Sequence, residues 1–350
     1  MSLLSHIINQ GDSRYYIGQL RYIAHLCYNK PSENFAEVFM KGKRREKNSS
    51  LKKYIVAARY DGMELEQYLK EVMSVSARQR QKLFFSRGVY VNGSSAHTKR
   101  VLKAGDMVAI RQFKDTSYGV VPEEGRVEVL YEDAEVIVLN KPAGMLVHPA
   151  GQTSTGTLAN YLAYYFKQQG QVVTIRPLHR LDRDTTGCVL FAKTAGAQGK
   201  LEAMLAAGQL HRKYGAVVCG DGALLQEKFP AGTINLPIGR NPLQPNRRQV
   251  MAGGKEAVTH FEVAKRGSRY SLLQLSLETG RTHQIRVHLA HAGCPEAGDR
   301  MYGSRSRDIR RQALHGRELE FLHPASGEPV VVKAPYPEDM QELIDIIDAE

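Results

Sequence analysis

Cysteine and long apolar runs are scarce in this sequence of 350 residues. Its four cysteines, Cys27, Cys188, Cys219 and Cys294, are widely separated and form no CxxC pair. This spacing argues against a disulfide framework or a zinc knuckle and favours a reducing compartment. No stretch reaches the roughly 18 to 20 apolar residues that span a bilayer, and the N-terminus lacks the pattern of a secretory signal. The sequence therefore predicts a cytoplasmic protein with no membrane partner.

Motifs for nucleotide cofactors and metals are also missing. The chain contains no P-loop, no Rossmann fingerprint and no HExxH pattern, although His283, His288 and His291 lie close together in the sequence. Histidines at surfaces or in cores are commoner than metal ligands. We therefore expect neither a metal site nor a cofactor.

An excess of basic residues is the main compositional feature that is present. Lys and Arg number 48 against 36 Asp and Glu, which gives a net charge of +12 and a pI near 9.4. Basic side chains that meet phosphates release condensed counterions, so this excess favours a polyanionic partner. A basic face that binds nothing is the alternative. The chain is long enough for two domains.

The first 113 residues of the chain divide into an extension and a compact unit. Residues 1–50 have weak periodicity and end in a basic, polar run, which predicts an N-terminal extension and linker that either contacts RNA or is merely solvated. Residues 54–113 have helical spacing over 65–72 and 78–85, followed by GVYVNG, whose Asn-Gly pair is a strong turn signal. The pattern predicts two short helices and a small β-hairpin.

This compact unit resembles the alpha-L RNA-binding module. The resemblance rests on the GVYVNG and LKAGDMVAI segments and implies RNA contacts from the basic residues on or near the two helices, Arg78, Arg80, Lys82 and Arg87. The alternative is a small structural appendage with a solvated basic face.

Residues 120–345 form a larger region in which strands follow one another without regular helix alternation. We expect strands over 127–131, 135–139, 188–193, 213–219, 258–264 and 272–277, and helices over 157–169 and 199–205. This order predicts an α+β fold on a mixed, mainly antiparallel sheet rather than a doubly wound one.

Two polar segments of this region are candidates for chemistry. HRLDRDTTG at 179–187 is a turn rich in ionisable groups, and catalytic groups concentrate on such loops. On the residues alone, Asp182 and Asp184 are better explained as turn and capping residues paired with Arg180 and Arg183 than as catalytic groups. TGRTHQIRVHL at 279–289 predicts a helix that begins near Thr282 as N-cap and presents Arg286 towards another segment.

The HRLDRDTTG segment resembles the HRLDxxTSG signature of the RluA family of RNA pseudouridine synthases, with Thr186 at the usual serine. NKPAGMLVHP at 140–149, RKYGAVVCG at 212–220, TGRTHQIRVH at 279–288 and landmarks over 298–324 are similar to the family's other blocks, in the same order. The family typically carries an alpha-L module in front. Gly316 and Glu296-Ala297 depart from its pattern, and we expect these departures to lie away from the catalytic loop.

The resemblance implies that the protein isomerises uridine to pseudouridine without a cofactor. It assigns Asp182 as the essential carboxylate, Arg286 as its partner and Tyr214 as the ring that stacks on the target base. It places the substrate against the residues around the aspartate, His179, Arg180, Leu181 and Arg183. We expect Asp182 and Arg286 to meet at the floor of a basic cleft lined by Tyr214.

Substrate choice and two rival functions complete the expectations. The appended module favours large-subunit ribosomal RNA over transfer RNA, and we expect a monomer. The first rival is a non-catalytic RNA-binding factor in ribosome assembly. The second is a nucleoside hydrolase that uses Asp182 and Asp184 as a carboxylate pair, although residues two apart in a turn seldom straddle one bond.

Overall fold

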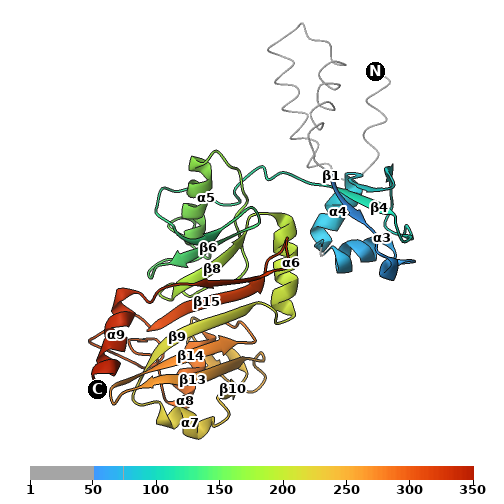
Figure 1. Ribbon diagram of the computed structural model, residues 1–350. Helices are drawn as coiled ribbons and strands as arrows, with labels where there is room; N and C mark the ends of the chain where they lie inside the picture. The colour runs from blue at the N-terminus through green and yellow to red at the C-terminus, as the bar shows by residue number, and fades with distance from the viewer. Residues whose placement is uncertain (1–50, 74) are drawn as a thin grey trace.

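The computed structural model describes residues 51–73 and 75–350, which build a small sheet and a large one (Figure 1). The extension and linker expected over residues 1–50 lies outside the described residues. None of the helices in the described ranges combines the length and apolarity that crossing a bilayer requires.

The small unit is a four-stranded antiparallel sheet with four short helical segments. Its strands are β1 (Leu51–Ile55), β2 (Val89–Val91), β3 (Ser94–Ser95) and β4 (Met107–Arg111), in the order β1-β4-β2-β3. Its helical segments are η1 (Ala58–Tyr60), α3 (Leu65–Gln67), the π-helical η2 (Tyr68–Val72) and α4 (Ala77–Phe85). The predicted helices and hairpin are confirmed, whereas the sequence did not reveal β1.

Local chemistry explains the bounds of these elements. The side chain of Ser76 accepts a hydrogen bond from the backbone N–H of Gln79, and the Gln79 side chain accepts one from the backbone N–H of Ser76, so a capping box begins α4. Asn92 and Gly93 both have left-handed φ angles, of 51° and 84°, as a two-residue hairpin turn demands. The predicted Asn-Gly turn is therefore confirmed.

The large sheet has ten strands and the path β10-β13-β14-β9-β15-β8-β6-β5. Its strands are β5 (Glu128–Glu132), β6 (Val136–Lys141), β7 (Arg176–Pro177), β8 (Thr186–Ala192), β9 (His211–Cys219), β10 (Thr233–Asn235), β13 (Val258–Arg266), β14 (Tyr270–Leu277), β15 (Leu314–Leu322) and β16 (Pro329–Lys333). β7 pairs with β8 and β16 with β15, and a separate hairpin joins β11 (Ile238–Arg240) to β12 (Arg248–Val250). Among the described strands, only the β8–β15 pair is parallel, which confirms the mainly antiparallel α+β fold.

Helices cover both faces of the large sheet, because successive strand residues point to opposite sides. One face packs against α5 (Leu158–Gln168), α7 (Ala223–Lys228) and α8 (Gln284–Ala292), through residues such as Leu139 and Ala216. The other face packs against α6 (Ala195–Ala206) and α9 (Glu338–Ala349), through residues such as Val138 and Val217. The central strands β6 and β8 are thus buried on both sides.

The parallel seam between β8 and β15 positions the polar turn that precedes β8. Gly187 lies opposite Gly316 there, and a Cβ on Gly187 would lie 2.2 Å from the Gly316 carbonyl oxygen. Thr186 Oγ1 lies 2.8 Å from His315 Nδ1 across the same seam, so the hydroxyl is retained where the family has serine. The expectation that Gly316 lies away from the catalytic loop is therefore wrong, because it packs at the foot of that loop.

We predict that Gly187→Ala destabilises the protein by more than about 3 kcal/mol, because the φ of 110° and the facing carbonyl both exclude a methyl group. Gly316→Ala is the matched control, since its Cβ would meet nothing closer than 3.5 Å and should change stability by no more than about 1 kcal/mol. Urea unfolding of the two variants measures the difference. Equal losses of stability would contradict this account of the seam.

Candidate active site

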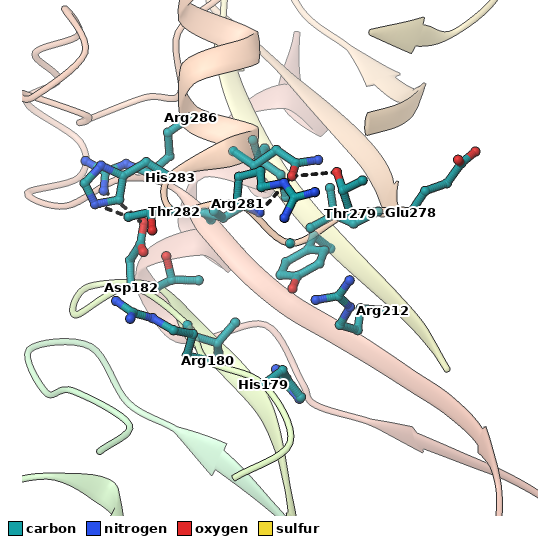
Figure 2. Close-up of a pocket in the computed structure, with 18 of the residues that line it drawn as sticks. His179, Arg180, Asp182, Arg212, Glu278, Thr279, Arg281, Thr282, His283 and Arg286 are labelled. Atoms are coloured by element: carbon teal, nitrogen blue, oxygen red, sulfur yellow. Dashed lines mark hydrogen bonds and ion pairs between the residues drawn. The ribbon is translucent and has the colours of Figure 1, made fainter. Parts of the chain in front are cut away.

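A cavity of about 440 Å³ lies where the turn before β8, strand β9 and the turn before α8 meet (Figure 2). Its charged lining residues are four arginines and two carboxylates, Arg180, Arg212, Arg281, Arg286, Asp182 and Glu278. A second cavity of about 430 Å³ adjoins it, and residues 178–181, which include the exposed Arg180 and the buried Leu181, line both cavities. The basic cleft expected from the sequence is therefore present.

Asp182 and Arg286 meet in this cavity, as the sequence predicts. Arg286 Nη1 donates a hydrogen bond to Asp182 Oδ2 at 3.0 Å, although 104 residues separate them in the chain. The Asp182 side chain keeps 18% of its surface exposed, against 6% for Arg286. The carboxylate therefore faces the cavity while its cation is buried behind it.

Arg286 is itself held by a second acid, Asp299. Arg286 Nε and Nη2 donate to the two oxygens of Asp299 at 2.7 and 2.9 Å, which is a bidentate pair. Burial disfavours the charge on Arg286, but the hydrogen bonds and charge of Asp299 outweigh it and raise the pKa of the guanidinium. The planar group is thus fixed in orientation, and its remaining nitrogen points at Asp182.

His283 approaches the same carboxylate from the N-terminus of α8. Its Nε2 lies 3.9 Å from Asp182 Oδ2, and its Nδ1 lies 2.8 Å from the Tyr302 hydroxyl. That hydroxyl also accepts a hydrogen bond from the backbone N–H of Arg248 at 2.9 Å, which fixes the position of the phenol beside the ring. Burial lowers the pKa of His283, while the charge of Asp182 acts in the opposite direction.

The start of α8 differs from the prediction. The helix begins at Gln284, and His283 is its N-cap with a left-handed φ of 59°, so the assignment of Thr282 as N-cap is wrong. The Gln284 side chain explains this, because its Oε1 accepts from the Arg281 backbone N–H and the Thr279 hydroxyl, each at 2.9 Å. Tertiary hydrogen bonds thus fix the turn, and the strained histidine is held beside the carboxylate.

Tyr214 and Arg212 lie on the cavity-facing side of β9. Tyr214 is 6% exposed and belongs to the core cluster, yet it also lines the cavity. Burial raises the pKa of its phenol, and the charge of Arg212 acts in the opposite direction. The tyrosine is therefore both a packed strand residue and part of the site.

The remaining residues that the resemblance assigned around Asp182 have different settings. His179 Nε2 accepts a hydrogen bond from the Leu190 backbone at 3.2 Å, and burial together with Arg212 lowers the pKa of His179 to about 3, so the ring is neutral. Leu181 is buried and Arg180 is exposed, and both line the two cavities. Arg183 lies outside either lining.

Lys141 fastens the turn that carries Asp182. Its side chain is fully buried, and Nζ donates to the carbonyl oxygens of Pro142, Met145 and Arg183 at 2.8, 3.0 and 2.8 Å. Burial lowers the pKa of Lys141 to about 7. One of these carbonyls lies in the turn that carries Asp182 and the other two in the loop after β6. Lys141 therefore joins the two loops that flank the site.

A third acid, Glu296, is buried beneath the pair. Its side chain is inaccessible, and neither carboxylate oxygen has a hydrogen-bond partner in the described structure. Burial, followed by the charge of Asp299, raises the pKa of Glu296 well above its usual value, so the group is neutral. The expectation that this departure from the family pattern lies away from the site is wrong, because Arg286 and Asp182 both act on it electrostatically.

The basic residues expected to contact RNA on the small unit also differ in setting. Lys82 and Arg87 are exposed, and Lys82 Nζ lies 4.1 Å from the centre of an aromatic ring. Arg80 is partly buried and donates to the Val75 carbonyl at 2.6 Å, so it also ties α4 to the preceding segment. Arg78 belongs to α4, and its side chain lies outside the described part of the chain.

Sequence reasoning did not single out Asp299, His283 or Arg212 as site residues. Each lies inside a block that was quoted for the resemblance, so membership of a block was the available signal. What was missing is the spatial relation of these blocks. Asp184, by contrast, does not line the cavity, so it forms no carboxylate pair with Asp182 there.

We predict that Glu296→Gln changes the pH dependence of stability. Above pH 4.5, the usual value, the unfolded chain releases the Glu296 proton while the folded chain retains it. The contribution of Glu296 is therefore fully present below that pH and is lost as the pH rises, by up to about 1.4 kcal/mol per pH unit. Urea unfolding between pH 4 and 8 should show that the free energy of unfolding of the variant increases relative to that of the wild type as the pH rises. Parallel stability curves would contradict a neutral, buried Glu296.

Comparisons with known proteins match this chain to RNA pseudouridine synthases. The family model described as RNA pseudouridylate synthase matches residues 135–291. The uncharacterized RNA pseudouridine synthase YhcT of Bacillus subtilis is 41% identical over 291 residues, which are 83% of this chain and 95% of that protein. Ribosomal large subunit pseudouridine synthase D of Xanthomonas campestris is 37% identical over 312 residues, 85% of this chain and 92% of its own length.

A solved structure shows the same fold. Human RNA pseudouridylate synthase domain containing 4 superposes with a TM-score of 0.50 at 22% identity, covering 63% of this chain and 93% of the human one. Both the sequence relatives and the fold thus confirm what the five motif blocks indicate. The chain belongs to the RluA family of RNA pseudouridine synthases.

Proposed function

We propose that Asp182 is the essential carboxylate with which this protein isomerises uridine to pseudouridine, and that large-subunit ribosomal RNA is its substrate. One observation carries the proposal. A carboxylate faces a basic cavity and is held at 3.0 Å by an arginine whose other nitrogens are fixed by a second acid.

The reaction explains why a carboxylate is needed at this point. Cleavage of the bond between the sugar carbon C1′ and the base nitrogen N1 builds positive charge on the sugar. A carboxylate beside the sugar stabilises that charge or bonds to it, as in glycosidases. The base then turns and reattaches through its carbon C5. Arg286 serves this step by holding the Asp182 carboxylate in one orientation in a partly closed site.

Tyr214 and the turn before β8 would receive the extruded nucleotide. The buried Tyr214 ring offers a flat apolar surface against which uracil can stack. Arg180 is exposed and lines both cavities, so it is placed to fill the gap that the target base leaves in the RNA. The neutral His179, Leu181 and Arg183 would shape and hold this turn around the substrate.

The two parts of the chain would divide the work. We assign residues 54–113 as an alpha-L RNA-binding domain and residues 120–345 as the catalytic domain, with residues 1–50 as extension and linker. Of the cations assigned to RNA contacts, Lys82 and Arg87 are exposed. Arg80 would contribute less, because its guanidinium is already engaged within the unit.

The relatives support ribosomal RNA as the substrate. Several proteins that are 35–38% identical to this chain over most of its length are named ribosomal large subunit pseudouridine synthase D. A substrate of this kind would place the protein in the cytoplasm, in agreement with its scattered cysteines. We propose that it acts there as a monomer.

We predict that Asp182→Asn abolishes the reaction and leaves the fold intact. Arg286 keeps its bidentate pair with Asp299 in this variant, so no cation is left without an acid. Tritium release from RNA labelled at C5 of uridine measures activity, and circular dichroism measures folding. Asp184→Asn, an identical change two residues along the turn, should retain activity. Full activity of Asp182→Asn would overturn the role of Asp182. Full rescue of a deletion strain by an inactive Asp182→Asn protein would favour the rival role as an RNA-binding assembly factor.

The substrate assignment predicts a specific loss in cells. Deleting the gene should remove one or a few pseudouridines from large-subunit ribosomal RNA and leave transfer RNA unchanged, when the modified sites of both are mapped. Restoring the wild-type gene should return them, and the Asp182→Asn gene should not. Loss confined to transfer RNA would overturn the ribosomal assignment while leaving the enzymatic one in place.

A further inference from the structure

Arg212 is a buried cation without an acidic partner. It is 8% exposed, and its Nε is buried with no hydrogen-bond acceptor. In the described part of the chain its two terminal nitrogens also have no acceptor or ion pair, and Nη1 lies 3.0 Å from where a Cβ on Gly280 would be. Figure 2 shows Arg212 on one side of the cavity and Asp182 on the other.

A cation in this position works against stability. Buried arginines are almost always paired, because removing a charge from water is unfavourable unless a partner compensates for it. Arg286, Arg176 and Arg311 in the same region follow that rule, since each has a carboxylate partner. Arg212 and Arg286 are the two buried arginines of the described residues, and of these only Arg212 has no carboxylate partner. A bound substrate would supply what it lacks.

The position of Arg212 indicates which part of the substrate it would contact. It is two residues before Tyr214 on β9, so both side chains lie on the same sheet face about 6 to 7 Å apart along the strand. That separation matches the width of a uracil ring. The RNA backbone would follow the exposed cations such as Arg180, whereas a residue that is 8% exposed can be reached only by a base inserted into the cavity.

We infer that Arg212 hydrogen-bonds a carbonyl oxygen of the target uracil and stabilises the negative charge that the base acquires when it leaves the sugar. This inference rests on the proposed function of the same cavity. It adds a catalytic residue whose role differs from those of Asp182 and Arg286, because it acts on the base rather than on the sugar.

The charge balance of the reaction gives Arg212 its task. When the C1′–N1 bond breaks, its electron pair stays on the base, and the uracil anion spreads this charge over N1, C5 and the two carbonyl oxygens. Asp182 meets the positive sugar, and Arg212 meets the negative base. The C5 carbon then bonds to C1′, its hydrogen leaves to solvent as a proton, and N1 takes up a proton. Preorganised donors at developing negative charge are among the largest catalytic effects.

The test separates rate from binding with enzyme in excess over total RNA from a deletion strain, labelled with tritium at C5 of uridine. The tritium-release rate is followed against enzyme concentration, which gives a plateau rate and a half-saturation concentration. Arg212→Gln should lower the plateau rate by about 10²- to 10³-fold and change the half-saturation concentration by less than about threefold. Arg212→Lys keeps the charge and loses the planar guanidinium, so its plateau rate should lie between those of the wild type and Arg212→Gln.

Lys213→Gln is the matched control. Lys213 is the neighbouring residue on the opposite face of β9, where it is 50% exposed and pairs with Glu318, and its variant should keep the wild-type plateau rate. An unchanged plateau in Arg212→Gln with a raised half-saturation concentration and a salt dependence reduced by one charge would identify a phosphate contact and overturn the inference. Wild-type protein that releases no tritium would overturn the proposed function itself.

Stability provides an independent readout. Because Arg212 is a buried cation without an acidic partner, the Arg212→Gln protein should have a melting temperature at or above that of the wild type, although its plateau rate is lower. A melting temperature well below the wild type would show that Arg212 stabilises the folded chain, and this would overturn its description as a cation reserved for the substrate.

Discussion

Arg286 lies between two carboxylates, and the rest of the site depends on that arrangement. Two of its nitrogens are committed to the buried Asp299, and the third holds Asp182 at the cavity. A guanidinium is suited to this position because its nitrogens are coplanar and fixed in direction. Asp182, in the turn before β8, and the helix that begins at Gln284 are thereby joined by a contact with a defined geometry rather than by packing alone.

The charges around this contact are distributed unequally. Arg286 and Lys141 are fully satisfied, by Asp299 and by three carbonyl oxygens respectively. Glu296 avoids the cost of a buried charge by remaining protonated. Arg212 alone among these four has no compensation, so its cost is consistent with a site in which stability is given up for the reaction.

The sequence predicted most of the secondary structure because alternating and helical spacing are local properties. Residues 157–169 and 258–264, for example, contain a helix and a strand within a few residues of the expected bounds. Thr282 was wrongly assigned as an N-cap because the Gln284 side chain fixes the turn before α8 through the Arg281 backbone N–H and the Val258 carbonyl oxygen of a distant strand. Gly316 and Glu296 were misplaced for a similar reason, since only the parallel β8–β15 seam and the turn after α8 bring them to the site.

The sequence by itself determined the kinds of elements, the mixed α+β class and the five motif blocks that assign the family, because each is written in neighbouring residues. Tertiary structure alone decided which blocks meet. The contact between Asp182 and Arg286 joins residues 104 positions apart, and the solitary charge of Arg212 is visible only once every neighbour is in place. Pairing and burial are properties of the packed chain, so no local pattern encodes them.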